Sequence, residues 1–342
     1  MMLAVLVVLV ILCLWRIRLT KTNHDYLSLD GTNAIKGVFA IIILCSHMGG
    51  YLTLDDSFGN RTYTHTMFYL GQTMVAPYLF YSGFGIFYSF RHKTRYSSGF
   101  FKNRFLKILL HFDLAILLFL IVQAFLPIRY PALNYLLCWI GWESIGNSNW
   151  FVFVILSLYL IAFCGLLLDT KNGLILITIV CFLSALLWIF LQFVAHKENW
   201  WIDTIAAFPL GMLFCAGKDN IDALLSKFRG IWLAMTVCLS TGFVIWHHLH
   251  GVDVYGICSC LFCLIIVFAS MKIIIGNPVL KWLGKNAFSI YILQRLPMLV
   301  LSHFGVNLQP SIFIPVSIVV TLPLAQGFTS LTTRIDQKVF NV

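Results

Sequence analysis

The chain has 342 residues, of which 60% are hydrophobic and only 11% are charged, against roughly 25% charged residues in a typical soluble domain. A soluble protein of this size leaves about 25% of its unfolded-chain surface exposed, so this composition excludes a soluble globular enzyme, and the hydrophobicity excludes a disordered chain. The formal net charge of +10 would suggest nucleic-acid binding in a soluble chain, but membrane proteins also carry excess Lys and Arg on their cytoplasmic side.

Apolar segments of spanning length recur along the whole chain. A membrane-spanning helix needs roughly 20 predominantly apolar residues. About eleven segments approach this pattern: 1–15, 35–54, 67–90, 105–127, 149–168, 174–195, 202–216, 231–246, 254–275, 287–304 and 311–331. We therefore expect an all-α fold, a polytopic helical bundle that forms one integral membrane domain over residues 1–342.

The distribution of basic residues predicts the orientation of this bundle. The first segment lacks a basic region before its apolar run, so we expect an uncleaved span with the N-terminus outside. Only Arg61, Arg129 and Lys197 then fall in outside loops, and Lys36 and Arg295 lie within or at the edge of spans, which leaves 18 of the 23 Lys and Arg residues inside. This asymmetry predicts an inside C-terminus and explains the net charge without a nucleic-acid partner.

The cysteines and histidines offer only weak candidates for a metal site. Nine of the ten cysteines, all except Cys138, fall inside predicted spans, where a free Cys behaves as a small hydrophobic residue. The run Cys258-x-Cys260-x-x-Cys263 lacks an evident fourth ligand. The histidines at 247, 248 and 250 lie at a predicted helix end, where exposure to water is the alternative to metal binding. We expect no metal.

Ionisable groups inside spans cost roughly 2.5–3.5 kcal/mol each on insertion scales and are functional candidates by default. The candidates are Lys36, His47, His111, Asp113, Asp203 and Arg295. Lys36 and His47 are eleven residues apart, which is about 1100° of rotation and about 16 Å of rise, so they share one helix face. His47 could accept a proton near neutral pH, and Lys36 at the inner mouth could attract an anionic substrate. The alternatives are an interhelical hydrogen bond for His47 and a snorkelling Lys36.

Two loops carry further candidate binding residues. In the basic inside loop, Arg104 and Lys107 are three apart at a helix start and face the same way. They could bind phosphates, or the loop could act only as a topology determinant beside anionic lipid. In the outside loop, Trp142 could stack on a sugar and Glu143 could bind its hydroxyls, with an interfacial aromatic belt as the alternative.

Five motifs together resemble the membrane-bound acyltransferase-3 family of O-acyltransferases, over a core of residues 27–331 that follows an extra span at 1–21. They are Leu29-Asp30-Gly31 with Lys36 and His47, Tyr81-Ser82-Gly83-Phe84, the segment from Phe101 to Lys107, Asn149-Trp150-Phe151, and Gly284 to Tyr291. Three positions differ from the family pattern. Lys36 replaces an Arg, Lys107 replaces the second Arg of Arg-x-x-Arg, and Gln294 replaces a His found in many members. Both Lys substitutions keep the charge but lose the bidentate guanidinium.

The resemblance implies transfer of an acyl group, most simply acetyl, from cytoplasmic acetyl-CoA to a hydroxyl of a sugar or glycan, in a bacterial cytoplasmic membrane. His47 would act as general base with Lys36 beside it. Lys36, Arg104 and Lys107 would bind the acetyl-CoA phosphates. Trp142, Glu143 and Ser82 would contact the acceptor, with close helix packing as the alternative role for Ser82 and Gly83.

An acyl-His47 intermediate is an alternative to general-base catalysis. A transporter or flippase of a saccharide or lipid is the alternative function, although the sequence shows no repeated halves. An inactive structural relative is a third reading, because of the departures at Lys36 and Gln294.

Overall fold

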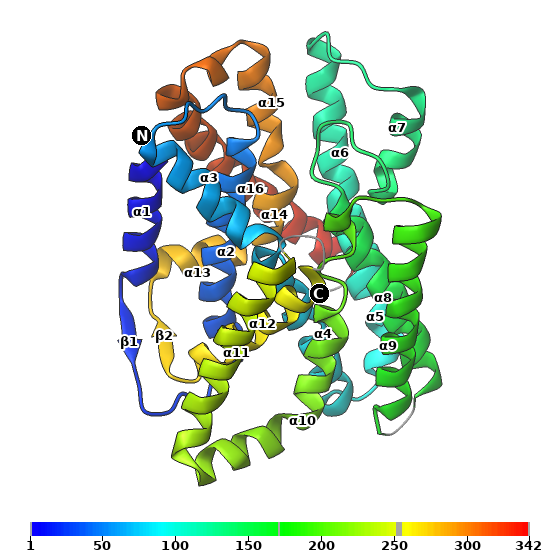
Figure 1. The fold of residues 1–342 in the computed structure, drawn as a ribbon. Coiled ribbons are helices and arrows are strands. Elements are labelled where there is room, and N and C mark those ends of the chain that lie inside the picture. The colour runs from blue at the N-terminus through cyan, green and yellow to red at the C-terminus, as the bar shows by residue number, and fades with distance from the viewer. Residues whose placement is uncertain (1, 170–171, 251–254, 341–342) are drawn as a thin grey trace.

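The computed structural model describes residues 2–169, 172–250 and 255–340 (Figure 1). Met1, Lys171 and Val254, which belong to the predicted spans and charge pattern, lie outside the described residues. The chain is 80% helical with almost no sheet, so the all-α prediction is confirmed.

The helices follow one another with short connections. The first half contains α1 (Met2–Leu14), α2 (Leu29–Gly49), α3 (Phe58–Leu70), η1 (Gly71–Met74), α4 (Ala76–His92), α5 (Tyr96–Phe100), η2 (Phe101–Leu106), α6 (Lys107–Phe125), α7 (Ala132–Leu137), η3 (Cys138–Ile140) and α8 (Trp150–Leu168). The second half contains α9 (Leu174–Ile189), η4 (Phe190–Val194), η5 (Asn199–Trp201), α10 (Ala207–Lys227), α11 (Arg229–His250), α12 (Tyr255–Ser270), α13 (Pro278–Lys285), α14 (Ala287–Leu293), α15 (Arg295–His303), η6 (Val306–Leu308) and α16 (Pro310–Val339).

Among the described residues, six helical stretches are long and apolar enough to cross a membrane: Leu29–Gly49, Tyr96–Phe125, Trp150–Leu168, Leu174–Val194, Gly230–His250 and Pro310–Val339. The other predicted spans fall on helices that are shorter, more polar or interrupted. The segment 67–90 is divided by η1, and the segment 287–304 is divided at Gln294, between α14 and α15. A multi-pass arrangement is therefore supported, and the count of eleven stays a prediction.

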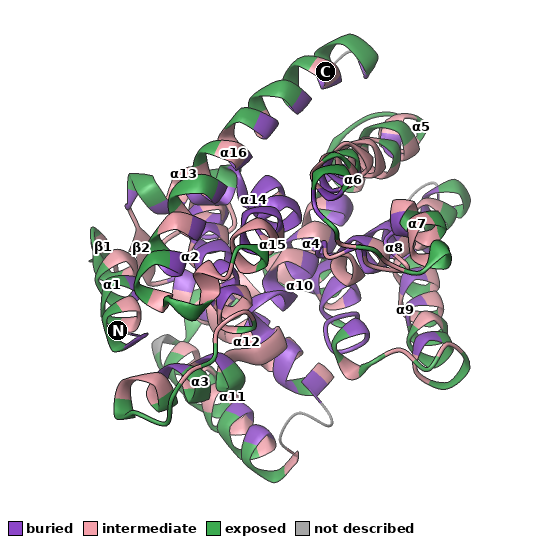
Figure 2. Ribbon diagram, turned by 90° about the horizontal axis from the view of Figure 1, so that it is seen from above, coloured by how far each residue is buried: buried purple, intermediate pink, exposed green. Residues whose placement is uncertain are grey.

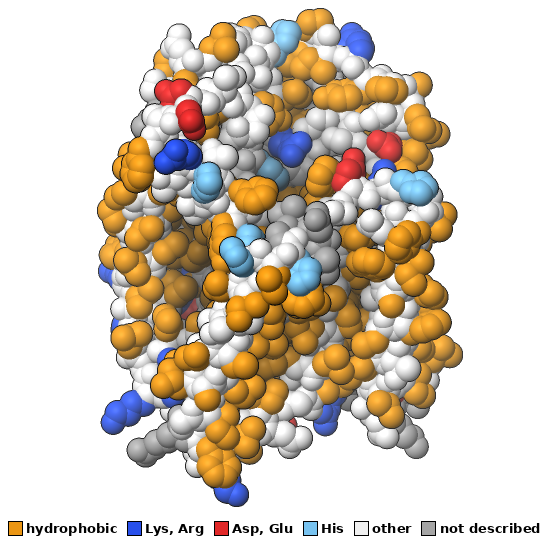
Figure 3. Space-filling view, viewed as in Figure 1, with side chains coloured by type: hydrophobic (Ala, Val, Ile, Leu, Met, Phe, Trp, Pro, Cys, Tyr) orange, Lys and Arg blue, Asp and Glu red, His pale blue; other side chains and the backbone are white. Residues whose placement is uncertain are grey.

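The outer surface of the bundle is apolar where helices face away from one another. Phe182 and Phe193 are each 62% exposed, and Val237 on α11 is 55% exposed. Figure 2 shows buried residues where helices face one another and exposed residues around the outside. In Figure 3 the middle of the visible face is mostly hydrophobic, and Lys and Arg side chains lie in its upper part and at its lower edge. Such a surface suits lipid better than water.

A short strand pair corrects the predicted span 254–275. Helix α12 ends at Ser270, and β2 (Ile273–Ile275) pairs antiparallel with β1 (Ile17–Leu19). Three consecutive β-branched residues favour an extended backbone, and the partner strand satisfies their backbone polar groups. The sequence analysis missed this pairing because the two strands are far apart in the chain.

Helix α2 differs in its bounds from the predicted span 35–54. The Ser28 hydroxyl accepts a hydrogen bond from the Gly31 backbone N–H, which caps the helix and starts it at Leu29. The Gly50 N–H donates to the His47 carbonyl at 3.2 Å and terminates it. His47 therefore lies in the last turn of α2, nearer a helix end than the sequence predicted.

Two pairs of helices cross so closely that the contacts require glycine. A Cβ added at Gly37 of α2 would collide with the backbone of Leu280 in α13, and one added at Gly284 of α13 would collide with the backbone of Asn33. Small residues at helix crossings let the two backbones approach. Lys36 directly precedes Gly37, and Lys285 directly follows Gly284. This crossing therefore fixes the positions of both lysines.

Helices α4 and α10 cross in the same reciprocal way. A Cβ at Gly83 would collide with the Phe208 carbonyl, and one at Gly211 would collide with the Phe80 carbonyl. The packing role considered for Gly83 is confirmed, and the crossing holds α4 in place beside α2.

We expect the substitution Gly83→Ala to destabilise the protein by about 3 kcal/mol, because overpacking against backbone cannot be relieved by a side-chain rotation. This should lower the Tm in detergent by about 5 °C or more. Gly85→Ala, in the same helix, is the matched control, because its Cβ would meet no atom within 4 Å. Equal Tm values for the two variants would show that the crossing tolerates a side chain.

Candidate functional site

Two cavities lie on opposite sides of one layer of side chains. The first, which we name the basic cavity, has a volume of about 400 Å³. Its lining includes Lys36, Tyr78, Tyr81, Ser82, Arg104, Phe151, Tyr159, Lys285, Phe288, Tyr291 and Gln294. The second, the aromatic cavity, has a volume of about 370 Å³. Its lining includes His47, Gln72, Trp142, Glu143, Asn147, Trp150, Lys197, Glu198, Trp200, Trp201 and Arg295.

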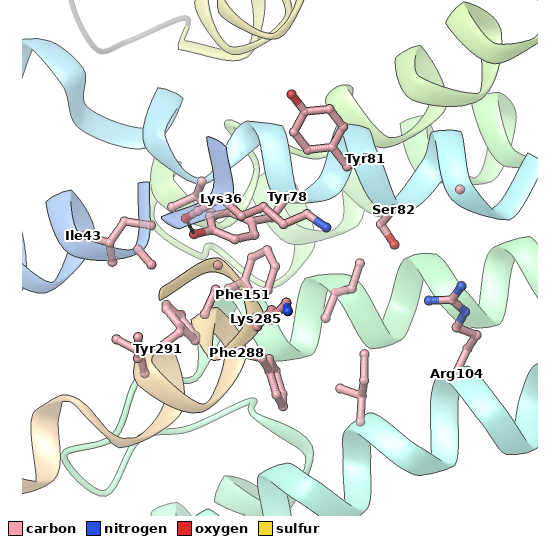
Figure 4. Close-up of a pocket in the computed structure, with 18 of the residues that line it drawn as sticks. Lys36, Ile43, Tyr78, Tyr81, Ser82, Arg104, Phe151, Lys285, Phe288 and Tyr291 are labelled. Atoms are coloured by element: carbon pink, nitrogen blue, oxygen red, sulfur yellow. Dashed lines mark hydrogen bonds between the residues drawn. The ribbon is translucent and has the colours of Figure 1, made fainter. Parts of the chain in front are cut away.

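Three basic side chains from three elements converge on the basic cavity (Figure 4). Lys36 comes from α2, where the Tyr78 hydroxyl donates to its backbone carbonyl at 2.6 Å. Its Nζ lies 5.8 Å from the centre of the Tyr81 ring. Arg104 comes from η2, a π-helical turn between α5 and α6, and such turns are frequent at functional sites. Lys285, at the end of α13, is the third cation.

The cations of the basic cavity have no carboxylate partners, unlike several lysines elsewhere. The paired lysines are Lys107 with Asp336 (2.7 Å), Lys197 with Glu143 (3.2 Å), Lys218 with Asp222 (2.5 Å) and Lys281 with Asp30. In the part of the chain that the structure describes, no carboxylate forms a salt bridge with Lys36, Arg104 or Lys285. Three unneutralised cations around one cavity favour a polyanionic ligand.

The predicted partner of Arg104, Lys107, is placed differently. Its ammonium pairs with Asp336 of α16, and the second carboxylate oxygen of Asp336 lies 2.9 Å from His111 Nε2. Lys107 does not line the basic cavity. It lines a neighbouring side cavity of about 540 Å³, together with Lys93, Arg95 and also Arg104. Arg104 and Lys107 thus share one face, as predicted, but only Arg104 reaches both cavities.

His47 occupies the layer that separates the two main cavities. The Gln294 amide nitrogen lies 2.7 Å from His47 Nδ1 and 3.2 Å from the Tyr291 carbonyl oxygen. His47 lines the aromatic cavity, whereas the fully buried Gln294 lines the basic cavity. An amide nitrogen only donates, so Nδ1 accepts and the ring proton of neutral His47 resides on Nε2.

Two pairs of residues that are adjacent in sequence also line opposite cavities. Trp150 lines the aromatic cavity and Phe151 lines the basic cavity, at the start of α8. Phe151 packs edge-on against Tyr291, with ring centres 5.3 Å apart. Gln294 and Arg295, which are adjacent in sequence, are divided in the same way, since Gln294 lines the basic cavity and Arg295 the aromatic cavity. Only a thin wall of side chains separates the two spaces at His47.

The predicted sugar-binding residues lie in the aromatic cavity and already contact a lysine. Lys197 Nζ lies 4.2 Å from the Trp142 ring centre and 4.7 Å from the Trp201 ring centre. It also donates to a Glu143 carboxylate oxygen at 3.2 Å. Ser82 is not part of this group. Its hydroxyl lies 2.7 Å from the Tyr159 hydroxyl in the basic cavity.

A family model described as an acyltransferase domain matches residues 29–329. The chain belongs to the acyltransferase-3 family. Searches of curated proteins and of solved structures gave no match. The resemblance seen in the sequence is therefore confirmed, and this acyltransferase-3 protein is a multi-pass membrane acyltransferase. The matched region starts with α2 and includes every lining residue named above for the two main cavities.

Three residues of the site were not assigned to it from the sequence. Lys285 was counted as an inside charge and as part of the motif from Gly284 to Tyr291, but no role in binding was assigned to it. Gln294 was noted only as a departure from the family pattern, and Arg295 only as an ionisable group at a span edge. The sequence signal for the division at Gln294 is Pro297, which has no N–H to bond the Leu293 carbonyl.

Proposed function

We propose that this acyltransferase-3 protein transfers a short acyl group, most simply acetyl, from acetyl-CoA in the basic cavity to a hydroxyl of a sugar or glycan in the aromatic cavity. The observation that carries the proposal is the His47–Gln294 pair, in which two hydrogen-bonded side chains line opposite cavities. A transfer reaction between substrates that arrive from two sides needs such a residue between them.

The basic cavity suits the donor. Coenzyme A is a polyanion, and Lys36, Arg104 and Lys285 supply three cations without carboxylate partners among the described residues. We place the phosphates between these cations and the side cavity, with Arg104 at the junction. Lys107 lines the side cavity, so a phosphate there would compete with Asp336 for its ammonium. The apolar lining towards Phe151 and Tyr291 suits the uncharged arm that carries the thioester.

His47 serves as the general base in this proposal. The imidazole takes the proton from the acceptor hydroxyl as the hydroxyl oxygen attacks the thioester carbonyl. The side-chain wall at His47 and Gln294 must open for this step, so that the two cavities join. A tetrahedral intermediate forms, the C–S bond breaks, and the departing thiolate takes the proton back. Direct attack by His47 on the thioester, with an acyl-His47 intermediate, is the alternative route.

Gln294 controls which nitrogen of His47 is available. In the structure its amide nitrogen faces Nδ1, which places the ring proton on Nε2. For Nε2 to accept a proton, the ring proton must first move from Nε2 to Nδ1 through water in the aromatic cavity. The amide must also rotate by about 180°, so that its carbonyl oxygen accepts from Nδ1–H and its hydrogen bond to the Tyr291 carbonyl is lost. We propose this exchange as the step that activates the base.

A location in a bacterial cytoplasmic membrane, with the N-terminus outside, belongs to the same proposal because it puts the basic residues on the side of acetyl-CoA.

Donor binding distinguishes this function from a transporter of saccharide or lipid. We expect acetyl-CoA to raise the Tm of the purified protein, by an amount equivalent to about 2.7 kcal/mol at a hundredfold excess over Kd. Acetylpantetheine, which lacks the nucleotide phosphates, should give a much smaller shift because it cannot engage the three cations. Thermal unfolding in detergent measures both. A Tm that does not change with acetyl-CoA but rises with a sugar would contradict the proposal and favour transport.

A further inference from the structure

Arg295 is a cation of the aromatic cavity that forms no salt bridge among the described residues, although Glu143 and Glu198 line the same cavity. A guanidinium has five N–H donors. In the described parts of the chain, none of those on Arg295 donates a hydrogen bond to protein, and no carboxylate forms a salt bridge with it. Its Nε is buried without a partner. The side chain as a whole is only partly buried, so its guanidinium is accessible to an anionic group that enters the cavity.

The other charged groups of this cavity do not satisfy Arg295. Glu143 is engaged by Lys197, which the rings of Trp142 and Trp201 also contact. Glu198 is exposed on the cavity lining. The positive charge of Arg295 therefore stays free within the aromatic cavity.

The position of Arg295 ties this free charge to the reacting centre. Its neighbour in sequence, Gln294, holds His47, and Arg295 and His47 line the same cavity. His47, Tyr51, Tyr130 and Tyr291 lie near its positive charge. An anion bound by Arg295 would thus lie close to the hydroxyl that His47 deprotonates.

We propose that the acceptor is an anionic glycan, in which an oxyanion on or beside the acylated sugar binds the guanidinium of Arg295. Carboxylate and phosphate share the chemistry that a guanidinium recognises through paired hydrogen bonds. This inference rests on the proposed function and specifies its acceptor class. Arg295 is a specificity-determining residue in this view, and it does not stabilise the oxyanion of the tetrahedral intermediate.

A binding experiment tests the charge requirement. Thermal unfolding of the full-length protein is measured with glucuronate, glucose 6-phosphate and glucose at equal concentrations. We expect one or both anionic sugars to raise the Tm more than glucose does, and Arg295→Gln to abolish that difference. A rise in Tm with glucuronate identifies a carboxylate as the recognised group, and a rise with glucose 6-phosphate identifies a phosphate. Equal effects of the three sugars, including no effect from any of them, would overturn the proposal, as would a difference that survives in Arg295→Gln.

A transfer experiment separates this inference from the proposed function. The protein is incubated with radiolabelled acetyl-CoA and envelope glycans from its native cells, and mass spectrometry locates the label. We expect the labelled sugar or its neighbour to bear a carboxylate or phosphate, and label on a wholly neutral region would overturn the inference. An absence of any transfer would instead contradict the proposed function and, with it, the inference.

Kinetics of the same reaction define the role of Arg295. Arg295→Gln should raise the KM for the glycan at least tenfold with little change in kcat, and Arg295→Lys should recover part of the affinity. The exposed Arg61 provides the control for loss of one positive charge, and Arg61→Gln should leave both parameters unchanged. A large loss of kcat at unchanged KM would show transition-state stabilisation instead.

Discussion

Replacing His47 with alanine should reduce acyl transfer by about 10²–10⁴-fold, which is the typical contribution of a positioned general base. The protein should still insert in the membrane and bind acetyl-CoA, because His47 lines the aromatic cavity rather than the basic one. Radiolabelled acetyl transfer measures activity, and the thermal shift by acetyl-CoA measures donor binding. The expected result is thus a loss of turnover with retained donor binding.

Two further variants keep this prediction testable if the alanine variant is unstable. His47→Gln retains most of the side-chain volume and hydrogen-bonding capacity but cannot take up a proton. Gln294→Leu keeps the base but removes the group that selects its tautomer, so it should lose less activity than either His47 variant. Turnover at the wild-type rate in His47→Gln would eliminate His47 as the base and also as a nucleophile.

Arg104→Gln should weaken acetyl-CoA binding by about 10–100-fold. A hydrogen bond to a charged group contributes about 1.5–3 kcal/mol, and each 1.4 kcal/mol corresponds to a tenfold change in affinity. Arg104 lines both the basic and the side cavity, and it has no carboxylate to neutralise it among the described residues. The KM for acetyl-CoA and the ligand-induced Tm shift are the measurements.

Lys107→Gln is the matched control, three residues further along the same helical stretch. Lys107 pairs with the buried Asp336, so its loss leaves a buried carboxylate without its ammonium partner. We expect Lys107→Gln to lower the Tm of the free protein more than Arg104→Gln does, and to raise the KM for acetyl-CoA less. The reverse pattern would assign the phosphates to Lys107 and leave Arg104 as a structural residue.

The sequence located the helices better than it located their ends and breaks. Apolar runs predicted a helix at every expected span, because hydrophobicity over about 20 residues is a property of each segment alone. The bounds of α2 follow from local caps at Ser28 and Gly50, and the division at Gln294 follows from Pro297, which has no N–H for the Leu293 carbonyl. The end of α12 depends on another part of the chain. The strand pair that ends α12 exists only because Ile17–Leu19 lies beside Ile273–Ile275.

The candidate site was also predictable only in part. The residue types that carry the chemistry were evident. His47 and Lys36 are costly to place in a membrane and are therefore functional candidates, and Arg104 lies in a basic loop that could bind phosphates. The sequence could not show that Lys107 is paired with Asp336 while Arg104 is not. It also could not show that Ser82 and Glu143 line different cavities.

By itself, the sequence determined that this is a helical membrane protein of the acyltransferase-3 family, because composition and motif order are local properties of the chain. Only the tertiary structure decided which cations have no carboxylate partner and can therefore bind a ligand. It also decided which side chains line the basic cavity and which line the aromatic cavity. The physical reason is that a charge is neutralised only by a partner within a few ångströms. The glycine crossings of α2 with α13 and of α4 with α10 bring such partners together, or keep them apart, across long stretches of sequence.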